Sequence, residues 1–222
     1  MKRLYKHLIV AAVLVAGFAA AFGSYLLLSP DGRGSAGLDV QPAAEALPVR
    51  ASSHRLTEPK KSELTIVEFL DFECEGCGAM YPVVEKLREE YGDRVTFVAR
   101  YFPMPGHRNG ELAARTAEAA ARQGKFEEMY NKLFTTQKEW GESQDWKEDV
   151  FRDYARQLGL DMNRFDADLA DPKVAGRVQD DQSDGLGLGV QGTPTFFVDG
   201  TRIQTPNSYQ AFKALIDGRL SG

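Results

Sequence analysis

The sequence contains few of the residues that form metal sites and disulfide networks. Its 222 residues include two cysteines and three histidines, and His7, His54 and His107 are scattered along the chain. Two cysteines are too few for a disulfide-stapled scaffold, which a chain of this size does not need. A zinc site takes four ligands, and no two of these histidines have the spacing of a ligand pair. We therefore expect neither a metal ion nor any other cofactor.

An excess of basic residues is also missing. Lysine and arginine together number 27 and aspartate and glutamate 32, which gives a formal net charge of −5 at pH 7. Binding to nucleic acid usually depends on a basic face, so we expect no nucleic-acid partner. With 43% hydrophobic and 27% charged residues, the composition is that of an ordinary globular protein.

The first informative segment is the N-terminus, where basic residues at positions 2, 3 and 6 precede the uncharged stretch Leu8–Leu28. A helix of this length spans roughly 30 Å, the thickness of the hydrocarbon core of a membrane. Residues 1–28 are therefore predicted to form a basic stub and one transmembrane helix, with the rest of the chain exported. A cleaved signal peptide is the alternative, because Ala19–Ala21 offers a small-residue cleavage site. The apolar run continues through Leu26–Leu28, which favours a retained anchor.

The next segment, Ser29–Pro59, is rich in Ser, Gly, Ala and Pro and shows no sustained periodicity. These properties predict a flexible linker. The folded domain is then expected to begin near Lys60 and to extend to residue 222, which is long enough for one well-buried core.

The start of this domain has the pattern of a strand, a helix and a second strand. Leu64–Phe72 is short, apolar and rich in β-branched and aromatic residues, which is typical of a strand buried on both faces. Cys77–Tyr91 has apolar residues at helical spacing, and Pro82 is expected to kink this helix or to lie near its first turn. Val95–Phe102 is the second strand candidate. Together they predict a parallel βαβ unit with a right-handed crossover.

The rest of the domain breaks into several helical segments over about residues 109–186 and then returns to strand patterns. Thr195–Val198 and Arg202–Gln204 are strand candidates, and Asp199-Gly200 between them is a strong hairpin signal. A final helix is expected after Asn207. The predicted fold class is therefore α/β, with a βαβ unit, a helical insert and a ββα unit.

Cys74-Glu75-Gly76-Cys77 is the main chemical signal. A C-x-x-C motif can be half of a zinc site, an inert disulfide or a redox pair. The redox pair is favoured because the motif lies between a buried strand and the first turn of a helix, whose free N–H groups lower the pKa of a thiol. Cys74, at the turn, is predicted to be the exposed nucleophile. Cys77, inside the helix, is predicted to be the shielded thiol that resolves the mixed disulfide.

Glu68 is a carboxyl group within an otherwise apolar strand. Burial of such a group is costly without a partner and raises its pKa. Beneath a dithiol, Glu68 could pass protons to or from Cys77. The alternative is that Glu68 faces solvent at a sheet edge. Asp71 and Glu73, nearer the motif, are expected to be solvated or capping residues.

The third signal is Thr193-Pro194, which opens a predicted strand. A proline in this position is compatible with a cis peptide bond, although the trans form is more common. A cis-proline loop that faces the dithiol would expose the backbone of Thr193 for pairing with an extended segment of a substrate.

Two segments that lie far apart in the chain resemble the signature segments of one known family. Phe69–Pro82 and Gly192–Gly200 are similar to the two signatures of DsbA-like proteins of the thioredoxin fold. The resemblance implies a thioredoxin fold with a helical domain inserted between its second and third strands, as the pattern of elements also indicates.

The resemblance also implies roles and partners. Cys74 looks like the attacking thiol, Cys77 like the resolving thiol, Pro194 like the cis-proline and Glu68 like the buried glutamate of the first strand. Proteins similar to this chain form or exchange disulfides in exported proteins with free thiols, and many are recycled by a quinone-linked partner in the membrane. Dimerising members of related families carry an extra N-terminal domain. Ser29–Pro59 is too poor in apolar residues to be one, so we expect a monomer.

One departure from the family pattern affects the direction of electron flow. Glu75 and Gly76 stand where strongly oxidising members often carry Pro and His. A histidine can stabilise the thiolate of Cys74, whereas a carboxylate opposes it. We therefore predict a weaker oxidant than those members. The alternatives that stay open are a reductase or isomerase fed by a membrane electron donor, and a non-enzymatic thioredoxin-fold chaperone.

Overall fold

The computed structural model describes residues 45–221. The predicted membrane anchor Leu8–Leu28 and the first part of the predicted linker lie outside these residues. Within the described part of the chain, no helix is both long enough and apolar enough to span a membrane.

The centre of the domain is a five-stranded sheet with the order β1-β3-β2-β4-β5. Its strands are β1 (His54–Arg55), β2 (Leu64–Leu70), β3 (Val95–Tyr101), β4 (Thr195–Val198) and β5 (Thr201–Arg202). The parallel strands β2 and β3 are joined by helix α2 (Glu75–Tyr91), and β4 lies antiparallel to β2 on its other side. Helix α9 (Tyr209–Leu220) follows the β4–β5 hairpin. The predicted α/β arrangement of a βαβ unit and a ββα unit is thus confirmed.

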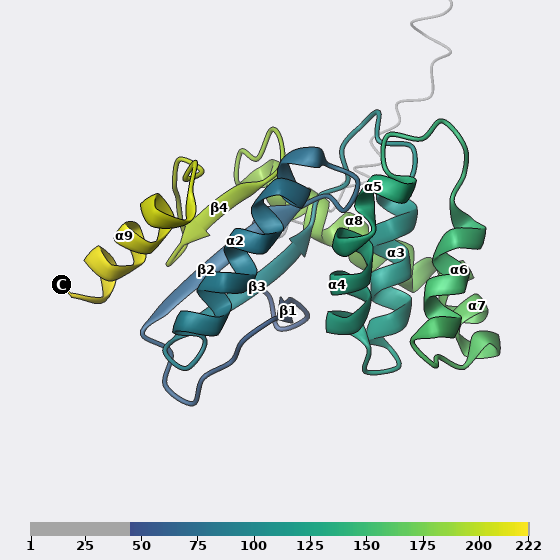
Figure 1. Ribbon diagram of the computed structural model, residues 1–222, viewed down its shortest axis with the longest axis horizontal. Coiled ribbons are helices and arrows are strands. Elements are labelled where there is room, and N and C mark those ends of the chain that lie inside the picture. The colour runs from purple at the N-terminus through teal and green to yellow at the C-terminus, as the bar shows by residue number, and fades with distance from the viewer. Residues whose placement is uncertain (1–44, 222) are drawn as a thin grey trace, which may run out of the picture. The chain divides into compact units, whose positions relative to one another are not determined.

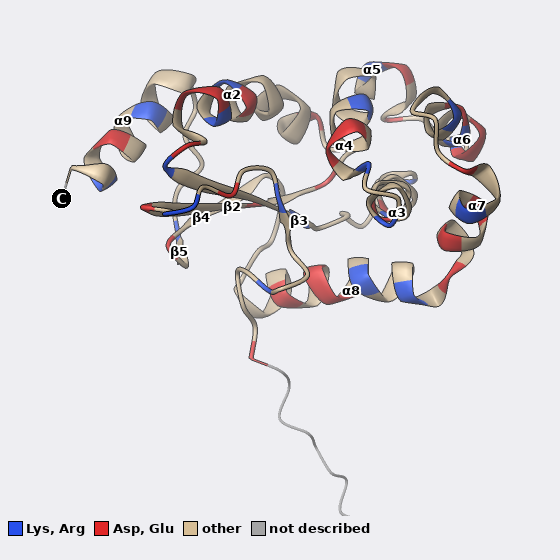
Figure 2. Cartoon of the chain, turned by 90° about the horizontal axis from the view of Figure 1, so that it is seen from below, with Lys and Arg blue, Asp and Glu red and all other residues tan. Residues whose placement is uncertain are grey.

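A helical insert separates β3 from β4 in the chain and lies beside the sheet (Figure 1). Its helices are α3 (Gly110–Ala121), α4 (Phe126–Thr135), α5 (Gln137–Trp140), α6 (Glu148–Gln157), α7 (Met162–Ala170) and α8 (Pro172–Gly187). The insert has an aromatic core, in which Trp140 packs edge-on against Phe151 with ring centroids 4.8 Å apart. Helix α8 then leads back along the sheet to β4 (Figure 2).

Strand β2 is buried on both faces because helices cover both sides of the sheet, with α2 and α9 on one side and α8 on the other (Figure 2). Ile66 and Leu70 pack in the large cluster that includes residues of α2 and α9, while Val67 and Phe69 belong to a smaller cluster on the opposite face. Successive side chains of a strand point to opposite faces. Glu68 therefore shares a face with Ile66 and Leu70 and lies under α2.

The segment before β2 belongs to the folded unit, which includes residues 45–59. His54 and Arg55 pair with β3 as strand β1, and Leu56 is buried in the main core. The prediction of a flexible linker up to Pro59, with a domain that starts near Lys60, is therefore wrong over these residues. The sequence pattern missed them because their order comes from contacts with distant residues and not from a local periodicity.

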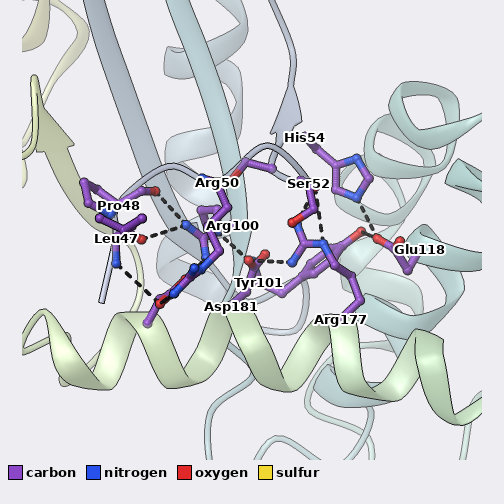
Figure 3. A network of polar contacts seen from close by, with 12 residues as sticks. Leu47, Pro48, Arg50, Ser52, His54, Arg100, Tyr101, Glu118, Arg177 and Asp181 are labelled. Carbon is purple, nitrogen blue, oxygen red and sulfur yellow. Dashed lines mark hydrogen bonds and ion pairs between the residues drawn. The ribbon is translucent and has the colours of Figure 1, made fainter. Parts of the chain in front are cut away.

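Residues 45–53, which we call the N-terminal strap, are held by a buried network of ion pairs (Figure 3). Arg100 of β3 is fully buried and donates hydrogen bonds to the carboxylates of Asp181 and Asp184 on α8. Its Nη1 donates to the carbonyls of Leu47, at 3.0 Å, and Pro48, at 2.8 Å. A buried charge is tolerated only when it is paired and its donors are satisfied. The strap is thus part of what allows Arg100 to be buried.

Candidate active site

The two cysteines lie at the junction between β2 and α2. Cys74 is the N-cap residue of α2 and has extended backbone angles, whereas Cys77 lies in the first turn of the helix. Cys77 is buried and Cys74 is partly exposed, and both are free thiols in this structure. The strand ends and the helix begins within a few residues, which places the free N–H groups of the helix next to the sulfur of Cys74.

The environment separates the protonation of the two sulfur atoms. The pKa of Cys74 is lowered to about 5, first by a hydrogen bond from Cys77 and then by contacts with Thr193 and the backbone N–H groups of Gly76 and Cys77, while burial opposes the shift. Burial raises the pKa of Cys77 well above its usual range. At neutral pH, Cys74 is therefore a thiolate and Cys77 a thiol. This is the division that an attacking and a resolving thiol require.

The predicted proline loop faces the dithiol. The Thr193-Pro194 peptide bond is cis, and the carbonyl oxygen of Thr193 lies 3.3 Å from Sγ of Cys74. Gly76 explains the close approach, because a Cβ atom at this position would lie only 3.3 Å from Cδ of Pro194. The side chain of Glu75, in contrast, is exposed.

Glu68 lies on the α2 face of the central strand and is only 5% exposed. The alternative that it faces solvent at a sheet edge is therefore wrong. Desolvation, followed by the nearby charges of Cys74 and Glu85, raises the pKa of Glu68 to about 8. The carboxyl group is thus protonated at neutral pH, and the proximity of Glu68 also contributes to the raised pKa of Cys77.

Asp71 and Glu73, expected to be solvated or capping residues, are both buried. Asp71 accepts hydrogen bonds from the backbone N–H of Met104, at 2.7 Å, and from Nδ1 of His107, at 2.6 Å. Glu73 accepts one from the backbone N–H of Asn109, just before α3, so the expectation of a capping role fits better than that of solvation.

His107 is a residue near the dithiol that the sequence did not single out. Its hydrogen bond to Asp71 is the main cause that raises the pKa of His107 to about 9, and the charge of Cys74 adds to the shift. At neutral pH it therefore adds a positive charge near the thiolate. Nothing in the local sequence marks it, because the contact with Asp71 joins residues on two different loops. Among the described residues, no group of His, Cys, Asp and Glu has the arrangement of a metal site.

The comparison with known families agrees with this site. Residues 58–218 match the family described as Thioredoxin. The chain belongs to this thioredoxin family. Curated relatives include the Na(+)/H(+) antiporter NhaA of Herminiimonas arsenicoxydans, 35% identical over 175 residues, and NhaA 3 of Salinispora tropica, 38% identical over 171 residues. These matches cover 79% and 77% of this chain but only 27% and 25% of the relatives, so this thioredoxin-family chain spans about a quarter of their length.

Solved structures share the fold of this chain over most of their length. A thioredoxin-like oxidoreductase from Silicibacter pomeroyi DSS-3 has a TM-score of 0.67 and 26% identity, and covers 80% of this chain and 97% of its own. BdbD from Bacillus subtilis has a TM-score of 0.69 at 23% identity, with 80% and 98% covered. Alpha-DsbA1 from Wolbachia pipientis has a TM-score of 0.69 at 19% identity, with 78% and 93% covered. The predicted DsbA-like fold is confirmed, as is the prediction that the chain is an oxidoreductase.

A groove of about 1080 Å³ opens between the loop after β3 and the helical insert of this thioredoxin-family domain. The loop after β3, which carries His107, forms one wall, and helices of the insert form the other. Trp146 is 64% exposed at the groove and lies under the guanidinium group of Arg108, 4.8 Å from the ring centroid. The groove thus offers an aromatic and cationic surface, and it shares His107 with the surroundings of the dithiol.

Proposed function

We propose that this oxidoreductase acts outside the cytoplasm, where it forms or exchanges disulfides in exported proteins with free thiols. The observation that carries the proposal is the split between an accessible thiolate, Cys74, and a buried thiol, Cys77, at a helix N-terminus opposite the Thr193-Pro194 loop. Such a pair favours a mixed disulfide at Cys74 and its release by Cys77.

In the oxidising direction, the Cys74–Cys77 disulfide is the electron acceptor. A client thiolate attacks Sγ of Cys74, the Cys74–Cys77 bond breaks, and Cys77 leaves as a thiolate that takes up a proton. A second client thiolate then attacks the client sulfur of the mixed disulfide. The client gains a disulfide, and the two electrons remain on the reduced Cys74 and Cys77.

Glu68 is suited to handle the proton of Cys77. Its carboxyl group is protonated at neutral pH and lies near enough to Cys77 that its ionisation would raise the pKa of that thiol, so it is able to donate a proton when Cys77 leaves as a thiolate. In the reverse reaction it accepts that proton. Thr193 and Pro194 supply the backbone edge on which an extended client segment pairs.

The location outside the cytoplasm depends on the N-terminal segment. Leu8–Leu28 is proposed to anchor the chain in the membrane, with a membrane redox partner that recycles the dithiol. The names of the relatives are consistent with a place at a membrane, because a segment like this chain forms about a quarter of each Na(+)/H(+) antiporter. Cell fractionation with protease treatment tests it: the chain should be membrane-bound and cleaved from the outside. N-terminal sequencing distinguishes an anchor from a cleaved signal peptide.

Substitution of each cysteine tests the chemistry. Cys74→Ser should reduce disulfide formation in a reduced two-cysteine peptide to the uncatalysed rate, because it removes the attacking sulfur. Cys77→Ser should keep the attack on a client disulfide but trap the mixed disulfide, visible on a non-reducing gel. If Cys74→Ser retains full function in a complementation assay, the redox proposal fails and a chaperone role takes its place.

The direction of electron flow has a second candidate, a reductase or isomerase fed from the membrane. The observation that favours it is the acidic Glu75 between the cysteines, because a carboxylate opposes the thiolate that drives strong oxidation. A redox titration against glutathione and the in vivo redox state decide between the two. A high potential and an oxidised pool support the oxidase, whereas a low potential and a reduced pool support the reductase.

A further inference from the structure

Gln137 of α5, in the helical insert, donates side-chain hydrogen bonds to the backbone of the active-site turn. Gln137 is 9% exposed, and its Nε2 donates hydrogen bonds of 2.8 Å to the carbonyl of Phe72 and of 2.8 Å to the carbonyl of Cys74. Both acceptors belong to the turn between β2 and α2, more than sixty residues earlier in the chain. The side chain thus bonds directly to the backbone of the nucleophile.

Gly78 of α2 lies against the side-chain amide of Gln137. A Cβ atom at this position would lie 2.0 Å from Oε1 of Gln137 and 2.8 Å from its Cδ, so no other residue leaves room for the amide. The φ angle of Gly78 is not in the left-handed region, so the backbone does not demand glycine there. A glycine inside a helix costs about 0.5–1 kcal/mol relative to alanine. The space that Gln137 needs is a physical reason for a glycine at this position in spite of that cost.

The hydrogen bonds act on the geometry that lowers the pKa of Cys74. The carbonyl of Cys74 accepts from the backbone N–H of Gly78, at 3.0 Å, in the first turn of α2, and Gln137 bonds the same oxygen. Gln137 also bonds the carbonyl of Phe72, two residues before the N-cap residue Cys74, so the turn is fixed at two points of its backbone. The N–H groups of Gly76 and Cys77 then stay directed at the sulfur of Cys74, which they stabilise as a thiolate.

We propose that Gln137 is a positioning residue, through which the helical insert holds the active-site turn and sets the reactivity of Cys74. This inference rests on the proposed function of the dithiol and adds a role for the insert. Gln137 does not touch the reacting sulfur; it acts through the backbone of Cys74. Gly78 is its partner, because only glycine leaves space for the amide.

The test replaces Gln137 by methionine in the full chain, which keeps the length of the side chain and removes both donors. The rate of Cys74 alkylation is measured against pH, and the reduction potential against glutathione. The midpoint of the alkylation profile should rise by about half to one pH unit, because the thiolate loses part of its fixed N–H environment. The matched control is Gln123→Met, also in the insert, which removes a 3.1 Å bond to the carbonyl of Asp161 remote from the cysteines. It should leave the midpoint unchanged.

Gly78→Ala provides an independent arm, because the added methyl group displaces the amide of Gln137. It should shift the midpoint in the same direction, and the double variant should shift it no further than the larger single effect. A folded Gln137→Met with the wild-type pH profile and potential overturns the inference. If Gln137→Met does not fold, an unchanged profile in folded Gly78→Ala overturns it instead.

The failure of this inference is distinguishable from the failure of the proposed function. If wild-type Cys74 titrates at a low pH and turns over peptide, but neither variant changes the profile, only the role of Gln137 is lost. If wild-type Cys74 titrates like an ordinary thiol and turns over nothing, the redox function itself is wrong.

Discussion

At the scale of single residues, burial decides which group near the dithiol carries a proton. Cys77 and Glu68 are both enclosed under α2, and burial raises the pKa of each, whereas Cys74 meets the N–H groups at the helix end. Two neutral acids therefore lie beneath one thiolate at neutral pH. This arrangement keeps a proton available for the sulfur that has to leave during exchange.

Glu68 leads to a prediction about stability and pH. Its pKa is about 8 in the folded state against 4.5 as the ordinary value, so between these pH values the folded protein keeps a proton that the unfolded chain has lost. The stability contributed by this group therefore falls as pH rises from about 4.5 to 8. We compare the free energy of unfolding of Glu68→Gln with that of the wild type, both fully reduced. The difference should shift in favour of Glu68→Gln by roughly 3 to 5 kcal/mol as the pH is raised from 4 to 9.

Urea unfolding of the two reduced proteins at a series of pH values measures this difference. The control is Glu75→Gln, whose exposed side chain should leave the pH dependence of the wild type in place. A constant difference between Glu68→Gln and the wild type across the whole range would show that Glu68 is ionised in the folded protein. Glu68→Gln should also slow the release of mixed disulfides if Glu68 supplies the proton.

At the scale of elements, the N-terminal strap and β1 complete the sheet on the side away from β4. Strand β1 covers the edge of β3, which would otherwise present unpaired backbone groups to other chains. Helix α8 supplies Asp181, which meets the buried Arg100 of β3 beneath the strap (Figure 3). It also supplies Asp184, which pairs with the same guanidinium group. Three segments far apart in the sequence are thus joined by one cationic side chain.

Arg100→Leu should destabilise the domain by about 3–5 kcal/mol, because it removes the shared buried cation from two buried carboxylates, which then keep only Arg177 and Arg50 as cationic partners. Thermal or urea unfolding measures the loss. The matched control is Arg94→Leu, which removes an exposed pair with Glu63 and should cost less than about 1 kcal/mol. Equal effects of the two substitutions would mean that the network contributes no more than a surface ion pair.

At the scale of the whole molecule, the folded unit depends on residues that a composition argument assigns to a linker. A shortened chain that starts at Glu45 keeps the strap, β1 and Leu56, whereas one that starts at Lys60 loses all three. The shorter chain leaves two donors of Arg100 without acceptors and exposes the edge of β3.

We therefore predict that the chain from Glu45 has the higher melting temperature and stays monomeric, while the chain from Lys60 melts earlier and tends to aggregate. Each buried donor left without a partner costs about 1–3 kcal/mol, which is a large part of the stability of a small domain. Calorimetry and size-exclusion chromatography of the two chains check this. Identical melting temperatures would show that the strap and β1 do not contribute to the stability of the domain.

The sequence by itself determined the local chemistry of this protein. A C-x-x-C motif between an apolar strand and a helix places Cys74 at a helix N-terminus, and the apolar residues on either side of Glu68 identify it as a carboxyl group that is costly to bury. These features depend only on neighbours in the chain, so periodicity and helix geometry are enough to predict them. The positions of β2, β3 and β4 and of the insert follow from the same kind of signal, whereas β1 does not.

Only the tertiary structure decided which distant residues surround the dithiol. The burial of Asp71 and Glu73, the pairing of Asp71 with His107 and the bonds from Gln137 to the active-site turn join residues with no periodic relation in the sequence. The strap was missed for the same reason, since its order comes from Arg100 and α8. From the local sequence alone, a polar side chain is predicted to be exposed to solvent. Only the packing of remote elements around it supplies the partners that make its burial possible.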